Sequence, residues 1–140
     1  MFNLIFILDS VAIVYICCIR KVFLNYKVIN YNVYWGGASK ILVKGKGDLI
    51  IGFKDTNRII LLKNVYFILQ FKVNLLSLSR LVDCIIAINI TIKTATFRKN
   101  NDNRILSTVN EKAGLYYLNY IVKKPKANIF SIIELKKILV

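Results

Sequence analysis

Residues 2–12 read FNLIFILDSVA, an apolar stretch interrupted by a single carboxylate at Asp9. The run from Phe2 to Leu8 has the length and the apolar content of a buried β-strand, which Asp9 and Ser10 then end. A carboxylate followed by a hydroxyl, directly after such a strand, suits a loop that carries out acid–base chemistry. The simpler alternative is an aspartate that only caps a local turn.

Aspartic protease chemistry at Asp9 would need a second carboxylate, because one carboxyl group acts as the base while the other acts as the acid. A single loop supplies only one such group. A domain of this size would therefore have to bring two copies of Asp9 together in a symmetric homodimer.

The apolar N-terminus, residues 1–19, is also open to interpretation as the anchor of a small basic membrane protein or as a signal segment. An ionised Asp9 in the middle of a membrane span would cost about 2.5–3.5 kcal/mol. Asn3 and Ser10 make the segment more polar, and no Lys or Arg precedes the apolar run as in a signal peptide. We therefore expect no stable membrane span.

The charge of the chain is strongly positive. Its 140 residues, enough for one domain, contain 21 Lys and Arg against 7 Asp and Glu, a formal net charge of +14. Such an excess favours polyanionic partners, either nucleic acid or an acidic membrane surface. An AT-rich coding sequence would also produce this composition, and the lysines are scattered rather than banded.

The absence of histidine narrows the possible chemistry. It excludes Ser-His and Cys-His catalysis and the zinc sites that contain histidine. The three cysteines, Cys17, Cys18 and Cys84, suit neither a disulfide framework nor a CxxC metal site, since their number is odd and two are adjacent. We expect buried, reduced thiols, with no metal and no cofactor.

Turn residues divide the chain into short apolar segments, which is the pattern of a mainly β protein. A β-meander is expected over residues 40–69, with turns at Gly45–Gly47 and at Asp55–Asn57. Its strands are expected at 41–44, 48–54, 58–62 and 65–69, and further strands at 31–35, 86–92, 105–109 and 114–122. The spacing of leucines predicts a short helix over 75–82, which Asn74 would cap.

These elements predict an all-β fold, a small closed barrel with one short helix, over residues 1–122. Residues 123–140 are expected to form a basic linker, beginning at Lys123, and a final helix. Ser131 and Glu134 have the spacing of a capping box, which opens this helix and lets it run to about Leu139.

Two further patterns have simpler explanations than ligand binding. Gly36-Gly37 and Gly45-x-Gly47 lack the form of a phosphate-binding loop and are expected to be turns. The segment 23–27, FLNYK, places aromatic rings beside a lysine, as in proteins that stack nucleic-acid bases, but packing of the rings in the core is the simpler explanation.

Five motifs follow one another along the chain: FILDSVA, KILVKGKGDLII, LLKNVYFI, VNLLSLSRL and GLYYL. In this order they resemble the protease region of copia-type LTR retrotransposon Gag-Pol polyproteins. FILDSVA (6–12) resembles the catalytic opening of that family, in which Leu-Asp-Ser is followed by Gly-Ala. KILVKGKGDLII (40–51) is similar to its central Gly-x-Gly hairpin, and LLKNVYFI (61–68) to its Leu-x-Asn-Val strand. VNLLSLSRL (73–81) is similar to its Asn-Leu-Leu-Ser helix. GLYYL (114–118) is similar to the strand that leads into the pre-integrase region.

The resemblance covers residues 5–122 and implies a retropepsin-like β-barrel that acts as a homodimer on peptides of its own polyprotein. Asp9 takes the place of the catalytic carboxylate, and Ser10 that of the hydroxyl that braces the two loops at the dimer axis. Gly45 and Gly47 take the place of a flap-like hairpin near the substrate. The resemblance also implies an intracellular location, in cytoplasmic virus-like particles.

Departures from the family pattern predict a degenerate copy. Val11 replaces the motif's Gly, and a β-branched residue is expected to crowd the loop, misplace Asp9 and impair activity. Tyr15 stands where the family has His, and Leu69 where it has Pro. The zinc-binding region that follows in the polyprotein is not found here, so we expect a truncated fragment. The alternative is a non-catalytic barrel remnant that binds nucleic acid through its positive charge.

Overall fold

The computed structural model describes residues 2–35, 39–83, 86–99 and 104–123. These residues form ten strands, one α-helix and two 3₁₀-helices. The strands are β1 (Phe2–Asp9), β2 (Tyr15–Cys17), β3 (Leu24–Trp35), β4 (Ser39–Phe53), β5 (Ile59–Phe67), β6 (Asn74–Ser77), β7 (Ile86–Ile90), β8 (Thr94–Lys99), β9 (Ile105–Lys112) and β10 (Leu115–Lys123). The helices are α1 (Leu78–Asp83), η1 (Arg20–Val22) and η2 (Leu69–Phe71). The mainly β class is confirmed, whereas the predicted final helix lies outside the described residues.

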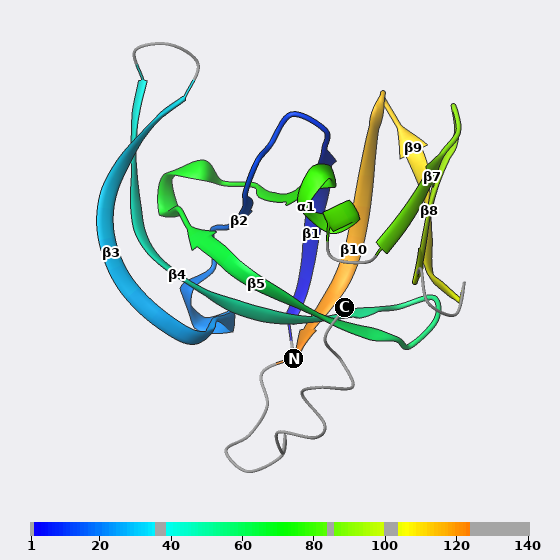
Figure 1. Cartoon of the computed structure of the whole chain (residues 1–140), viewed down its shortest axis with the longest axis horizontal. Helices are drawn as coiled ribbons and strands as arrows, with labels where there is room; N and C mark the ends of the chain where they lie inside the picture. Colours follow the sequence, from blue (N-terminus) through cyan, green and yellow to red (C-terminus); the bar gives the residue numbers. More distant parts are fainter. Residues whose placement is uncertain (1, 36–38, 84–85, 100–103, 124–140) are drawn as a thin grey trace.

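All ten strands belong to one sheet, in the order β3-β4-β5-β2-β6-β1-β10-β9-β8-β7 (Figure 1). β4 also pairs with β10, with Phe53 opposite Tyr120, so the sheet curls until two distant strands meet. β3 and β7 each have one neighbour among the described strands, so the sheet keeps two edges. The β-barrel type of fold is confirmed, although the sheet as a whole is not the closed barrel that the sequence predicts.

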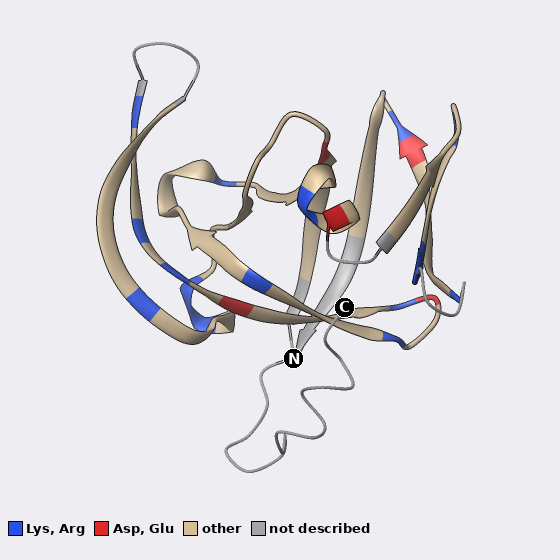
Figure 2. Cartoon of the chain, in the orientation of Figure 1, with Lys and Arg blue, Asp and Glu red and all other residues tan. Residues whose placement is uncertain are grey.

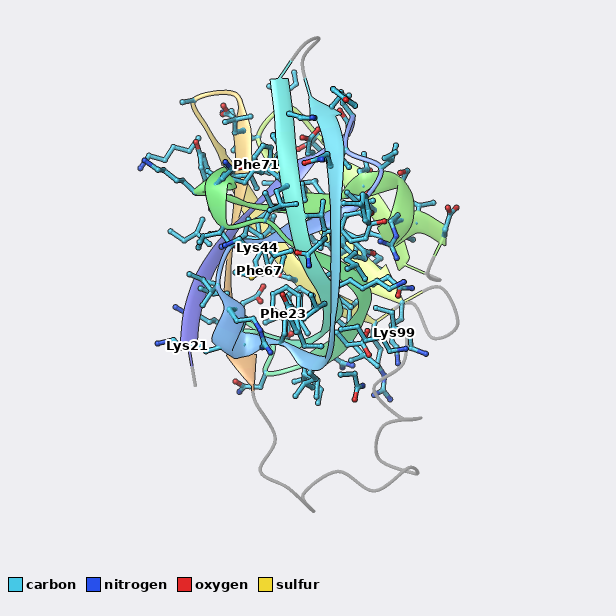
Figure 3. All side chains as sticks on the ribbon, turned by 90° about the vertical axis from the view of Figure 1, so that its left-hand side faces the viewer. Lys21, Phe23, Lys44, Phe67, Phe71 and Lys99 are labelled. Carbon is cyan, nitrogen blue, oxygen red and sulfur yellow. The ribbon has the colours of Figure 1, made fainter. Side chains whose placement is uncertain are left out.

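One main hydrophobic core holds the curled sheet together. Its buried side chains are Phe6, Leu8, Tyr15, Cys17, Val22, Phe23, Leu49, Ile51, Phe53, Ile60, Leu62, Val65, Phe67, Leu76, Leu81, Ala95, Phe97, Leu106 and Leu118. The rings of Phe23 and Phe67 meet edge to face, with centroids 5.9 Å apart, behind β3 and β4 (Figure 3). Burial of these side chains fixes the strand register, because a slip of one residue would turn each of them to the other face.

The apolar N-terminal stretch forms β1, a strand inside the sheet. β1 pairs with β10 in antiparallel and with β6 in parallel orientation. Within the described ranges, no helix is both long enough and apolar enough to cross a membrane.

β6 is inserted between β1 and β2, although β1 and β2 follow each other in the sequence. It pairs in parallel with β1, where Ser77 lies opposite Asp9, and in antiparallel with β2, where Leu75 lies opposite Ile16. All four residues of β6 are buried. This strand therefore fills the space below the loop that joins β1 to β2.

The predicted helix over 75–82 is wrong in its first turn, because α1 begins only at Leu78. Asn74 does not cap it, since Asn74 lies in β6. Ser77 is the residue before the helix, and its Oγ accepts a hydrogen bond from the backbone N–H of Arg80 at 3.3 Å, as an N-cap does. The leucines of this segment pack as strand residues because hydrogen-bonding partners lie on both sides of them.

β4 runs without a break through Gly45 and Gly47, so the predicted turn at these glycines is wrong. A Cβ atom at Gly45 would lie 2.2 Å from the hydroxyl oxygen of Tyr26. A Cβ atom at Gly47 would lie 2.7 Å from the carbonyl oxygen of Leu24. The glycines therefore allow β3 and its aromatic ring to pack closely on β4.

Other boundaries differ from the prediction for local reasons. The sequence predicts two strands, at 58–62 and 65–69, where the structure has the single strand β5. Asn64 lies between the two predicted strands with a φ of 56°, and β5 continues through it. The predicted turn at Asp55–Asn57 is confirmed, with Asn57 also at φ 56°. The alternating pattern of 86–92 ends early, at Ile90, because Ile92 belongs to the turn before β8.

Candidate active site around Asp9

Asp9 is the last residue of β1, and its carboxylate shapes the loop that follows. Its Oδ1 accepts hydrogen bonds from the backbone N–H groups of Val11, at 2.8 Å, and Ala12, at 3.1 Å. This is the turn-capping geometry that an aspartate after a strand favours. The carboxylate is half-buried and is held in one orientation by its own loop.

β6 supports the loop from below. The Ser77 hydroxyl donates a buried hydrogen bond of 2.7 Å to the carbonyl oxygen of Ala12. The Asn74 amide donates to the carbonyl oxygen of Ile5 at 3.1 Å and accepts from the backbone N–H of Cys18 at 2.9 Å. Asn74 thus joins β1 to the end of β2. The motif at 73–81 was recognisable from sequence, but the hydrogen-bonding roles of Asn74 and Ser77 were not. The preference of Ser for N-cap positions was the sequence feature that could have identified Ser77.

A cleft of about 330 Å³ opens beside Asp9. It is lined by Ile7, Leu8, Asp9, Ser10, Leu78, Ile90, Gly114, Leu115 and Tyr116. Most of these side chains are apolar, so the Asp9 carboxylate and the Ser10 hydroxyl are placed at the edge of an apolar hollow. The far side comes from β7 and β10, where the Tyr116 hydroxyl donates to the carbonyl oxygen of Thr91.

Val11 does not crowd its own loop, contrary to the expectation from sequence. Its φ is outside the left-handed region, so the backbone needs no glycine there. Its side chain is 85% exposed and points away from the core. Ser10 is exposed as well, and its predicted bracing contact would be with a second chain. An effect of Val11 on activity would therefore have to arise where a second chain approaches this loop.

Gly45 and Gly47 do not lie at the end of a hairpin. They lie within β4, while the β3–β4 connection falls at residues 36–38, outside the described residues. The β3–β4 ribbon itself projects from one side of the molecule (Figure 1). The flap prediction for these two glycines is thus not supported by their position in the strand.

The two described cysteines, Cys17 and Cys18, do not form a reactive site. Cys17 is a buried free thiol, as predicted, whereas Cys18 is a free thiol that is only half-buried, and Cys84 lies outside the described residues. Burial raises the pKa of the Cys17 thiol to about 12, and burial also raises the pKa of Cys18. The thiolate is the nucleophilic form of cysteine, so neither thiol is activated at neutral pH.

Asp9 is the one acidic side chain among the described residues that line the cleft. A catalytic carboxylate pair there would have to draw its second member from another copy of the chain. In the part of the chain that the structure describes, no group of three or more His, Cys, Asp or Glu could hold a metal ion.

A family model for the β-barrel domain of Pol polyproteins matches residues 6–85, more than half of the chain. The match begins in β1, includes Asp9 and its loop, and extends past α1. The GLYYL motif at 114–118 lies outside it. No curated protein and no solved structure matches the chain.

The matched residues contain the features that build the site. They include the Asp9 loop, the β3–β4 ribbon and the inserted strand β6, all within one mainly β sheet. Sequence match and fold agree on a β-barrel domain. The chain therefore belongs to the β-barrel domain family of retrotransposon-like and viral Pol polyproteins.

Proposed function

We propose that this domain is, by descent, an aspartic endopeptidase of the copia type, with Asp9 as its catalytic carboxylate. The observation that supports the proposal is the position of Asp9 at the end of β1, where it lines the apolar cleft beside Ser10. Two backbone hydrogen bonds hold this carboxylate in place before any substrate arrives. The substrate would be a peptide segment of the polyprotein itself.

In the proposed mechanism, two chains bring their Asp9 side chains together at a two-fold axis. Two close carboxyl groups share one proton, so one takes a proton from water while the other gives its proton to the peptide carbonyl oxygen. The water oxygen bonds to the carbonyl carbon and forms a tetrahedral intermediate. The C–N bond then breaks as the nitrogen takes up the proton that the first carboxyl group took from water. A hydroxyl of the intermediate returns a proton to the second carboxyl group, and two peptides are released. Ser10 would bind the loop of the second chain.

We also propose that this copy has low activity because of Val11. The side chain of Val11 is 85% exposed on the loop that a second chain has to approach. A glycine at this position would present no side chain, so the two loops could come closer. In a symmetric dimer the obstruction occurs twice, once from each copy, and would keep the two carboxylates apart.

The test is cleavage of a peptide from a Gag-Pol junction by the full chain. We expect slow turnover by the unmodified chain, faster turnover by the Val11→Gly variant, inhibition by pepstatin, and loss of activity when Asp9→Asn is added. Ile13→Gly is the matched control, because Ile13 is 78% exposed in the same loop and its removal should not restore activity. Fast, pepstatin-sensitive turnover by the unmodified chain would overturn the impairment. Turnover that survives Asp9→Asn would overturn the role of Asp9.

A further inference from the structure

β3 and β4 form a long ribbon whose strand register gathers lysines on one face. Lys27 lies opposite Lys46, and Tyr34 lies opposite Lys40. Residues directly opposite each other share a face of a sheet, and so do alternate residues of one strand. Lys44 therefore lies on the same face as Lys40 and Lys46. We call these five residues the ribbon face; Figure 2 shows blue segments along β4 and a blue segment on β3.

Among the described residues, the lysines of the ribbon face have no carboxylate that neutralises them. Lys27, Lys40 and Lys44 are exposed, Lys46 is half-buried, and none of the four forms an ion pair with a carboxylate of a described residue. The nearby carboxylate of Asp48 accepts hydrogen bonds from other groups, the side-chain amide of Asn25 and the backbone N–H of Asn64. Like charges opposite each other destabilise a sheet. The opposed charges of Lys27 and Lys46 therefore lower the stability of the sheet, and an anion bound between them would reduce this repulsion.

We propose that the ribbon face binds single-stranded nucleic acid. A row of lysines along a strand matches the linear array of phosphate charges, and Lys44 and Lys46 are about 7 Å apart along β4. Tyr34 is 68% exposed, and its place opposite Lys40 would let a base stack on the ring while a neighbouring phosphate meets the ammonium group. This site is separate from Asp9 and does not depend on the proposed peptidase activity.

A lipid surface is a poorer match for the same face. Peripheral membrane binding needs a broad exposed apolar surface beside the charges, which inserts between the lipids. Leu42 lies between Lys40 and Lys44 on the same face of β4, and it is only partly exposed. Its backbone N–H donates a hydrogen bond to the Gln70 side chain at 3.4 Å. Single-stranded nucleic acid needs only the charges and the aromatic ring that are present.

The test is fluorescence anisotropy of a labelled oligouridine with the full chain. Four phosphate contacts predict that the affinity falls about 50-fold between about 50 mM and about 200 mM salt. The ribbon variant replaces all four lysines with glutamine: K27Q, K40Q, K44Q and K46Q. The control variant replaces four exposed lysines elsewhere and changes the net charge equally: K54Q, K63Q, K93Q and K112Q. Tyr34→Leu removes the stacking ring alone.

We expect the ribbon variant to lose most of its affinity and of its salt dependence, while the control variant keeps both. Tyr34→Leu should weaken binding about fivefold or more without a change in salt dependence. Equal losses in both lysine variants would overturn the proposal, as would tighter binding of duplex DNA or of phosphatidylserine vesicles than of oligouridine. Circular dichroism shows whether each variant is folded. If the ribbon variant is unfolded, the single variants K40Q and K44Q are measured in its place.

Discussion

Replacing Asn74 with alanine should loosen the support below the Asp9 loop. Asn74 is 7% exposed, and its amide binds the carbonyl oxygen of Ile5 and the backbone N–H of Cys18. The first of these groups lies on β1 and the second directly follows β2, the two strands that flank β6. Alanine would leave both groups without this partner in a part-buried site.

The magnitude follows from the two lost hydrogen bonds to the backbone, because the third contact of the Asn74 amide, from the Cys18 thiol at 3.4 Å, involves a weak donor. A buried polar group left without a partner costs about 1–3 kcal/mol, and these two hydrogen bonds are part-buried, so the free energy of unfolding should fall by about 2–3 kcal/mol, the lower part of the range for two groups. Small domains have about 5–15 kcal/mol in total, so the variant loses a large part of its stability. A loss of about 3 kcal/mol would lower the melting temperature by about 10 °C in a chain of this length.

The assay is urea unfolding followed by circular dichroism, with Asn89→Ala as the control. Asn89 is an exposed asparagine of β7, so its replacement should change stability by less than about 0.5 kcal/mol. A loss for Asn74→Ala no larger than that of the control would refute the idea that Asn74 joins the two strands.

Asn74→Asp separates the donor role of the amide from its acceptor role. An ionised carboxylate can still accept from Cys18 but has no hydrogen to donate to Ile5, whereas a protonated carboxyl can do both. The folded state therefore favours the protonated form and raises the pKa of the introduced carboxyl above its usual value of about 3.9. The variant should be closest to the parent chain below about pH 4 and lose relative stability as the pH rises through the raised pKa. A stability difference that does not change with pH would contradict the donor role.

Gly45→Ala should destabilise the chain by about 1–3 kcal/mol in urea unfolding, because the added Cβ meets the ring of Tyr26. Most of this loss should disappear in a Tyr26→Leu background, and an unchanged loss would show that the ring is not the obstacle. In a Cys84→Ser background, a thiol reagent at about pH 8 should modify Cys18 well before Cys17, since burial raises the pKa of Cys17 to about 12. Equal rates for the two thiols would contradict the burial of Cys17.

The strand before Asp9 and the turn after it could be predicted from sequence, because both depend on neighbouring residues. An apolar run of strand length, followed by an aspartate and a serine, has few other local solutions. The same holds for the turn at Asp55–Asn57. The order of motifs also indicated a domain of a Pol polyprotein, which the family match confirms, since this order does not depend on contacts between distant residues.

The positions of β6 and of the two glycines could not be predicted, because distant residues decide them. The leucines after Asn74 have helical spacing, and only the presence of β1 and β2 on either side makes a strand the better packing. Gly45 and Gly47 have the appearance of turn residues, but they are needed for close contacts with Tyr26 and Leu24, about twenty residues earlier in the chain.

The effect of Val11 at the site also could not be predicted from the neighbouring residues alone. From sequence, its β-branched side chain is expected to strain the loop, yet its φ is ordinary and its side chain is exposed. The loop is therefore intact in the single chain, and the effect of Val11 depends on a second copy that the local sequence does not describe. The proposed defect therefore lies in the approach of the two loops and not in the folding of either loop.

A mixing experiment tests most directly whether catalysis needs one Asp9 from each of two chains. The Val11→Gly chain is mixed with an equal amount of the same chain carrying Asp9→Asn, at constant total concentration, and pepstatin-sensitive peptide cleavage is measured. Random pairing leaves about one quarter of the dimers with two intact carboxylates, so the rate should fall to about one quarter of that of the unmixed Val11→Gly chain. A fall to about one half would mean that each chain acts alone, and that result, or no activity at all in the Val11→Gly chain, would contradict the account.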